Sequence, residues 1–172
     1  MESVALTDSL PLSGRANNYV YDAEGHPRDP REGALLATGR TVSPDYFSTL
    51  GMRLMRGRLL TSQDESGSSH AIVINESMAA RLWPHQDPVG RHLIDVGDEP
   101  TPAVWNKDAA SVVVGVVSNT HGGSLAGGFG DEVYLPMTTT REQPVMYVLL
   151  RTRAGAAEAA AILRGVAKSS ER

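Results

Sequence analysis

The most hydrophobic stretch of the chain is a run of five valines around one glycine, from Ser111 to Ser118. Valine is enriched in strands because its branched side chain packs well on a pleated surface. The run has no alternation of apolar and polar residues, so neither face of the strand suits water. It therefore predicts a strand that is buried on both faces or lies at the centre of a sheet, which requires a core on each side of that sheet.

Shorter patterns predict the rest of a mixed α+β fold. Glycine and proline together account for 27 of the 172 residues, which favours short strands and many turns over a helical bundle. Strand-like segments bounded by turn residues occur at 3–7, 18–21, 37–42, 70–74, 91–95, 133–135 and 146–151. We expect mixed or antiparallel short strands together with three short-to-medium helices.

The helices are predicted from their end signals. In the first, 44–50, Ser43 can cap the helix and Gly51 can end it. The second begins after Asn75 as its cap and ends before Pro84, whose ring would clash with the preceding turn. The third spans 156–168, where apolar residues recur at helical spacing.

Composition excludes several functional classes. The 16 basic and 20 acidic residues give a net charge of −4, and no stripe of lysine and arginine is available for a nucleic acid. The absence of cysteine excludes disulfides, thiolate catalysis and cysteine-ligated zinc. No apolar run approaches the roughly 18 to 20 residues that a membrane-spanning helix needs.

No catalytic, cofactor-binding or metal-binding residue is predicted. The glycine-rich segment 119–130 lacks the Lys and Ser/Thr of a phosphate-binding loop, so a connecting loop is favoured. The histidines lack the spacing of metal ligands, and His121, the most active-site-like of them, has no evident carboxylate to orient it. A hydrolase that uses His121 is the weakest hypothesis. Adjacent acids such as Asp131 and Glu132 point to opposite faces of an extended segment, so they cannot share a site.

Other candidates are interpreted as structural. The arginines at 53, 56 and 58 have acidic residues nearby in the sequence and are typical of a solvated or salt-bridged surface. Trp83 could stack on a ligand, but its place on the apolar side of a short helix favours a core or interface anchor. The residues expected to hold the structure or an interface are Tyr46 and Phe47 on the first helix, Gly51 at its end, Trp83 in a pocket, and Pro88 and Gly90 in a turn.

Seven short motifs follow one another between residues 42 and 136. They are Val42 to Gly51, Gly57-Arg58 with Asp64, Ile72 to Glu76, Ala80 to Pro84, Asp87 to Gly90, Val113 to Val117, and Tyr134 to Pro136. Leu149 to Thr152 comes after them. In this order they resemble the periplasmic core domain of MacB/FtsX-like ABC transporter permeases, and within that group the duplicated permeases that lack a fused ATPase.

The resemblance implies two lobes: a Porter-like αβ lobe from residues 1–60 and 131–172, truncated at both ends, and a β-rich Sabre-like lobe from residues 61–130. It also implies a non-catalytic domain on the periplasmic face of the bacterial inner membrane, without a cofactor. The implied partners are transmembrane helices of the parent chain, a second copy in a homodimer, a cytoplasmic ATPase subunit and a periplasmic adaptor. A stand-alone periplasmic or secreted binding module of the same fold is the alternative.

Overall fold

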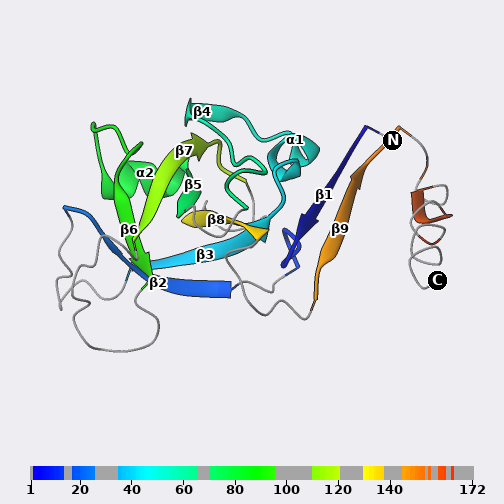
Figure 1. Ribbon diagram of the computed structural model, residues 1–172, viewed down its shortest axis with the longest axis horizontal. Helices are drawn as coiled ribbons and strands as arrows, with labels where there is room; N and C mark the ends of the chain where they lie inside the picture. Colours follow the sequence, from blue (N-terminus) through cyan, green and yellow to red (C-terminus); the bar gives the residue numbers. More distant parts are fainter. Residues whose placement is uncertain are drawn as a thin grey trace.

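In a computed structural model the protein forms one extended sheet with two short helices in the described part of the chain (Figure 1). The structure describes residues 2–13, 17–25, 35–65, 70–95, 110–120, 130–137, 145–153, 155, 159–161 and 164. The elements are β1 (Ser3–Thr7), β2 (Asn17–Ala23), β3 (Leu35–Val42), α1 (Tyr46–Leu50), β4 (Leu54–Gly57), β5 (Ala71–Asn75), α2 (Glu76–Leu82), β6 (His92–Asp95), β7 (Ser111–Val117), β8 (Glu132–Pro136) and β9 (Tyr147–Arg151).

Six strands pair in a closed circuit, which we call the ring. Its order is β2, β6, β7, β5, β8 and β3, and β3 pairs back with β2. The pairs β5–β7 and β3–β8 are parallel, and the other pairs of the ring are antiparallel. Strand β4 is added to β7 outside this circuit. The α+β fold with mixed short strands is thereby confirmed.

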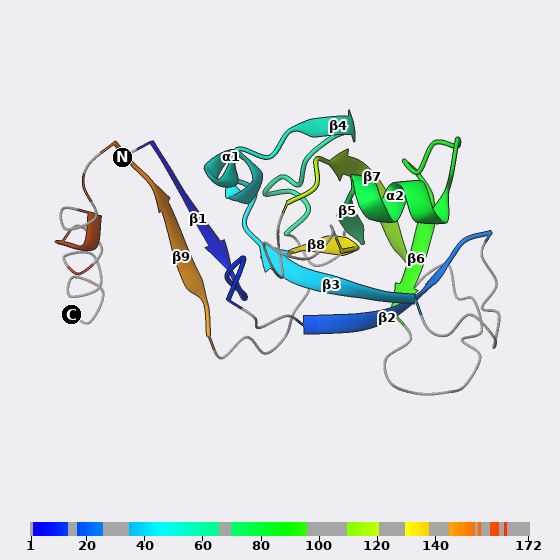
Figure 2. The ribbon, with the colours of Figure 1, turned by 180° about the vertical axis from the view of Figure 1, so that it is seen from behind.

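Strands β1 and β9 form an antiparallel pair that stands to one side of the ring (Figures 1 and 2). The two strands pair along five register positions, from Ser3 with Arg151 to Thr7 with Tyr147. Against the ring, however, β1 pairs with β3 at the single position Thr7–Val42. We call β1 and β9 together the arm, which is attached to the ring over a short length.

The buried strands β5 and β7 separate two hydrophobic clusters. Ile72 and Ile74 of β5 face the cluster that includes α2, and Val73 faces the cluster that includes α1. Val113 and Val117 of β7 are completely buried, one in each cluster. The valine run therefore forms a central strand with a core on each face, as predicted.

The helix ends agree with the sequence in one case and differ in another. The side chain of Asn75 caps α2 as predicted, because its Oδ1 accepts a hydrogen bond from the Met78 N–H at 3.1 Å. The prediction that Ser43 caps the first helix is wrong, since α1 has no side-chain cap. The Ser43 hydroxyl instead accepts a hydrogen bond from the Leu6 N–H at 2.9 Å, so it joins β1 to the chain after β3.

Three other features bear on the sequence predictions. Strand β4 was not predicted from the sequence; it carries a register shift between Leu54 and Arg56 where it pairs with β7. The predicted helix 156–168 lies mostly outside the described residues. Within this segment the structure describes 159–161 and 164, which are helical. The division into lobes at residues 61 and 130 stays a prediction. The ring takes strands from both expected lobes.

Candidate functional site

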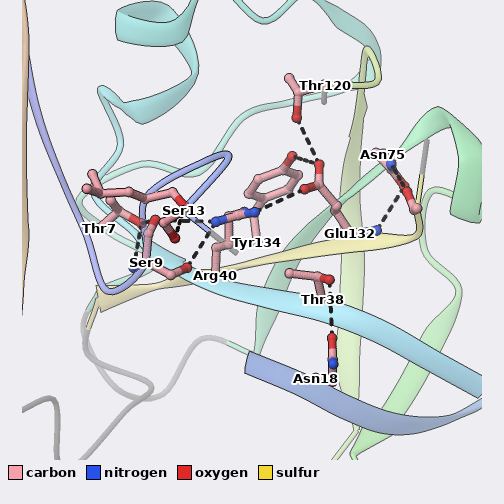
Figure 3. A network of polar contacts seen from close by, with 12 residues as sticks. Thr7, Ser9, Ser13, Asn18, Thr38, Arg40, Asn75, Thr120, Glu132 and Tyr134 are labelled. Atoms are coloured by element: carbon pink, nitrogen blue, oxygen red, sulfur yellow. Dashed lines mark hydrogen bonds and ion pairs between the residues drawn. The ribbon is translucent and has the colours of Figure 1, made fainter. Parts of the chain in front are cut away.

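A buried ion pair lies where the arm meets the ring. Arg40 of β3 and Glu132 of β8 are 1% and 3% exposed, and Arg40 Nη2 lies 3.4 Å from Glu132 Oε1 (Figure 3). The parallel register sets Glu132 beside Thr38, so Arg40 lies two residues further along the same face of β3. Burial of a charge is costly unless it is paired and hydrogen-bonded, so the other contacts of this pair matter.

The Glu132 carboxylate has two further hydrogen-bond donors. The Tyr134 hydroxyl donates to Oε2 at 2.6 Å and the Thr120 hydroxyl donates to the same oxygen at 3.0 Å. Burial, together with the adjacent Glu132 charge, raises the pKa of Tyr134 well above its usual value. The phenol therefore keeps its proton and acts as a permanent donor to Glu132.

The other end of Arg40 reaches the loop that follows β1. Its Nη1 donates to the Ser9 hydroxyl at 3.0 Å and to the Ser9 carbonyl at 3.3 Å. The Ser9 hydroxyl in turn donates to Asp8 Oδ1 at 3.2 Å, and Asn17 Nδ2 donates to Asp8 Oδ2 at 3.1 Å. One guanidinium thus connects the end of the arm to strand β8, and Figure 3 shows it between Ser9 and Glu132.

Backbone hydrogen bonds reinforce the same junction. The Asp8 N–H donates to the Thr41 carbonyl at 3.1 Å, and the Ser43 N–H donates to the Leu6 carbonyl at 3.0 Å. On the side of α1, Arg151 Nη1 of β9 donates to the Ser48 carbonyl at 3.2 Å. We call this set of contacts, with Arg40 and Glu132 at its centre, the junction network.

A second ion pair holds the chain after β4. Arg58 donates to both carboxylate oxygens of Asp64, at 2.7 and 2.9 Å, and this hydrogen bonding raises the pKa of Arg58. Asp64 is 4% exposed and also accepts from the N–H and hydroxyl of Thr61. Within the cluster of arginines singled out in the sequence, Arg58 is therefore salt-bridged, as interpreted.

Two of the expected structural residues lie close to the junction network. Tyr46 and Phe47 of α1 are completely or almost completely buried, and their rings lie 5.9 and 5.2 Å from that of Tyr134 between centroids. Burial raises the pKa of Tyr46. Gly51 follows α1 with a φ of +70°, a left-handed conformation that glycine adopts without a Cβ penalty.

The other three lie around α2, away from the network. Trp83 is 3% exposed, and its Nε1 donates to the Glu24 carbonyl at 3.0 Å. Pro88 and Gly90 belong to a turn in which the Arg91 N–H donates to the Pro88 carbonyl at 3.1 Å and the Gly90 N–H donates to the Val113 carbonyl at 2.8 Å. The structural and interface roles of all six residues stay predictions.

An open groove of about 550 Å³ lies between β4 and α2. Its lining is Met55 and Arg56 from β4, Glu76, Ala79 and Ala80 from α2, Trp83, His85, Gln86 and Pro88 from the following segment, and Val116 from β7. Trp83 and Pro88, two of the predicted structural residues, are thus also part of a surface feature. The groove contains no group of metal ligands, and none was found elsewhere among the described residues.

One histidine forms a close polar pair. His92 Nδ1 lies 2.6 Å from Glu24 Oε2, and the His92 N–H donates to the same oxygen at 3.2 Å. The hydrogen bond from His92 holds the pKa of Glu24 below its usual value. This pair joins β6 to the end of β2, and the sequence analysis assigned no role to His92. His121 lies outside the described residues.

No role in the ion pair was predicted for Arg40 or Glu132 from the sequence. A usable signal was present: Arg40 is a single charge within the otherwise uncharged segment Ala37 to Val42, which was itself predicted to be a strand. A charge inside a buried strand requires an opposite charge on a neighbouring strand. The signal does not say which acid, because the two partners are 92 residues apart in sequence.

A family model described as the MacB-like periplasmic core domain matches residues 4–166. The MacB macrolide export ATP-binding/permease protein of Aggregatibacter actinomycetemcomitans is 30% identical over 98 residues, which are 57% of this chain and 13% of that protein. Its counterpart in Bartonella quintana is 28% identical over 102 residues, 58% of this chain and 14% of that protein. The chain thus spans a small part of the length of these relatives.

Solved structures show the same fold. The periplasmic region of MacB from Actinobacillus actinomycetemcomitans superposes with a TM-score of 0.64 and 19% identity, over 97% of this chain and 66% of that one. The extracellular domain of the noncanonic ABC-type transporter YknZ from Gram-positive bacteria gives a TM-score of 0.58 and 16% identity, over 93% and 69% of the two chains. No helix among the described residues has the length and apolar character needed to span a bilayer.

Proposed function

This chain belongs to the MacB-like periplasmic core domain family of ABC transporter permeases, and we propose that it is a non-catalytic domain that couples ATP-driven movement in the membrane to a substrate or partner outside the cytoplasm. The relatives carry ATP-binding in their names, whereas this chain corresponds to 13–14% of their length. We therefore assign ATP hydrolysis to a cytoplasmic subunit or domain. Transmembrane helices of the parent chain, a second copy and a periplasmic adaptor are the other proposed partners.

The attachment of the arm to the ring is the observation that carries this proposal. The start of β1 and the end of β9 lie side by side, because Ser3 pairs with Arg151. Membrane segments before and after the sheet would therefore reach it at the same end of the arm. At its other end the arm meets the ring through one register pair, Thr7 with Val42, and through the junction network. Between its ends, Ala5 and Leu149 pack in the hydrophobic cluster that includes α1.

A short junction of this kind can transmit a displacement. Five paired positions make the arm a two-stranded unit, and the pairings of the ring close on themselves. Rigid-body rotation of one part of a protein about its interface with another is a common form of coupled movement. Arg40 would then carry a movement of the arm to Glu132, and through it to Thr120 at the start of the glycine-rich segment.

Distance measurements in the intact permease can test this coupling. The variant Leu36→Cys/Val148→Cys places one spin label on β3 and one on β9, at residues that are 58% and 47% exposed. Pulsed electron paramagnetic resonance would then compare the nucleotide-free transporter with the ATP-bound one. We expect the distance distribution between the labels to change with ATP, and to change less when Arg40→Met and Glu132→Gln are added together.

A matched label pair within the ring and β4 serves as the control. Leu36→Cys/Leu54→Cys joins β3 to β4, both outside the arm, and its distances should not respond to ATP. Identical distributions for the arm pair with and without ATP would contradict the coupling.

A coding sequence without flanking apolar segments of about 20 residues would instead favour the stand-alone binding module.

A further inference from the structure

Asn75 lies at the end of the central strand β5, directly before α2. Its side chain is completely buried and makes three hydrogen bonds. Oδ1 accepts from the Met78 N–H and from the Glu132 N–H, both at 3.1 Å, and Nδ2 donates to the Gly130 carbonyl at 2.7 Å. Figure 3 shows Asn75 beside Glu132. One side chain therefore connects the first turn of α2 to the start of β8.

A helix cap needs only one of these contacts. Serine, threonine, aspartate and asparagine all cap helices, because one side-chain oxygen accepts from a free N–H of the first turn. The contact with Met78 meets that need. The contacts with Gly130 and Glu132 lie outside the helix, and they require a side chain longer than that of serine with both an acceptor and a donor. Asn75 thus links two elements in addition to capping one.

A further contact ties α2 to the same segment. Arg81, in the last turn of α2, forms an ion pair with Asp131. Gly130, Asp131 and Glu132 are consecutive, so three neighbouring residues at the start of β8 contact α2 or its cap. A displacement of Glu132 therefore has a direct hydrogen-bonded route to α2.

Glu132 belongs to two sets of contacts at once. Its carboxylate is part of the junction network, while its backbone N–H is bound by Asn75. Arg40, Tyr134 and Thr120 all hold this carboxylate, and Glu132 is 3% exposed, so close packing leaves its side chain few alternative rotamers. A movement of the carboxylate with Arg40 therefore also moves the backbone of β8 at this residue. Contiguous hydrogen-bond networks of this kind can carry coupling between distant parts of a protein.

We propose that Asn75 is a positioning residue that carries a displacement of the junction network to the first turn of α2. Glu132 moves with Arg40, Asn75 follows the N–H of Glu132, and Met78 follows Asn75. Helix shifts of about 1–2 Å occur in many such transitions. The inference rests on the proposed coupling, since it names an element to which the movement of the arm is passed. Helix α2 is then a second output beside the glycine-rich segment.

Nuclear magnetic resonance of the 172-residue chain can test this route. Tyr134→Phe removes one hydrogen bond from the Glu132 carboxylate and keeps the ring, so it disturbs the network mildly, whereas Arg40→Met disturbs it strongly. We expect both variants to shift the amide signals of Glu132 and Met78. The indole N–H of Trp83, at the other end of α2, should not shift. An unchanged Met78 amide would overturn the proposal, and so would an equally large shift of the indole, which would show a general loosening of the fold.

Two substitutions at position 75 separate linking from capping. Asn75→Ser keeps an oxygen for the helix cap but does not reach Glu132 or Gly130. Asn75→Asp keeps both acceptor contacts and loses only the donor to Gly130. We therefore expect the response of the Met78 amide to Tyr134→Phe to persist in the Asn75→Asp background and to be mostly lost in the Asn75→Ser background. Equal responses in the two backgrounds would overturn the proposal, because the asparagine would then act as a cap alone.

Asn119→Ala is the matched control. Asn119 Oδ1 accepts from the Ser77 N–H at 2.9 Å, so this variant removes another hydrogen bond of the first turn without changing Asn75. The response of the Met78 amide to Tyr134→Phe should persist in this background. Loss of that response would contradict the assignment to Asn75, because the movement would then reach α2 through Asn119.

Failure of the proposed function has a different signature. Asn75 lies beyond Arg40 as seen from the arm, so the labels on Leu36→Cys/Val148→Cys should respond to ATP in the Asn75→Ser permease as they do without this substitution. Labels that never respond would contradict the coupling and this inference with it. Labels that respond, together with equal Met78 responses in Asn75→Ser and Asn75→Asp, would contradict the role of Asn75 alone.

Discussion

Replacement of Arg40 by methionine tests whether the junction network holds the arm to the ring. Methionine fills much of the same volume but leaves Glu132 without its cation. Removal of one partner from a buried ion pair costs about 3–5 kcal/mol, because the other charge stays buried and uncompensated. The contact between Arg40 Nη2 and Glu132 Oε1 is long at 3.4 Å, and Glu132 keeps its bonds from Tyr134 and Thr120. We therefore expect the lower end of that range, about 3 kcal/mol.

The assay is urea unfolding followed by far-ultraviolet circular dichroism, with melting temperature as a second measurement. For a chain of this length 1 kcal/mol corresponds to roughly 2–4 °C, so Arg40→Met should lower the melting temperature by about 6–12 °C. The double variant Arg40→Met/Glu132→Gln leaves no buried charge unpaired and should be more stable than Arg40→Met alone. This ordering distinguishes loss of an ion pair from loss of packing.

The exposed Arg56→Met variant is the matched control and should change stability by less than about 0.5 kcal/mol. A cost below about 1 kcal/mol for Arg40→Met would refute the reasoning, because the pair would then contribute no more than a surface salt bridge. A double variant less stable than both single variants would refute it as well, since it would show that the two side chains act through their volume.

Three further perturbations have outcomes that the structure determines. Trp83→Ala should lower the free energy of unfolding by about 3–5 kcal/mol in urea, since the indole is buried and hydrogen-bonded. An unchanged urea concentration at the midpoint of unfolding would contradict this, because it would show that the surroundings of the indole relax fully. Gly57→Ala should lower the free energy of unfolding by about 2 kcal/mol or more, because φ is +68° and a Cβ would lie 2.2 Å from a carbonyl oxygen of β7. Gly25 also has a positive φ, +82°, but has open space around it, so Gly25→Ala should lower the free energy of unfolding by less. Urea unfolding measures both. His92 holds the pKa of Glu24 below its usual value. The pair therefore stabilises the fold at any pH above the unfolded-state pKa of Glu24, near 4.5. This contribution is lost as the pH falls through the lower pKa that Glu24 has in the folded protein. His92→Ala should therefore flatten the fall in stability that begins as the pH drops through the unfolded-state pKa of Glu24, and a carboxyl titration of Glu24 that is identical in both proteins would contradict this.

Local patterns in the sequence predicted most of the regular structure. The valine run, the cap at Asn75 and the glycine after the first helix each act over a few residues, through side-chain shape, a near-neighbour hydrogen bond or a backbone conformation. Strand β4 was missed because its residues are exposed and carry no alternating pattern. Its strand conformation comes from pairing with β7, which is far away in the sequence.

The candidate site depended on long-range placement. Ser43 had the local pattern of a helix cap, yet its hydroxyl bonds Leu6, 37 residues earlier, because β1 passes the end of β3. Arg40 and Glu132 are 92 residues apart and meet only through the parallel register of β3 and β8.

The sequence by itself thus determined most of the segments that are strands or helices and the burial of the central valine strand, since those properties arise from each residue and its neighbours. Only the tertiary structure decided which strands close the ring, where the arm joins it, and which charges meet. Strand partners and registers are selected when the buried faces of segments far apart in the sequence pack against one another.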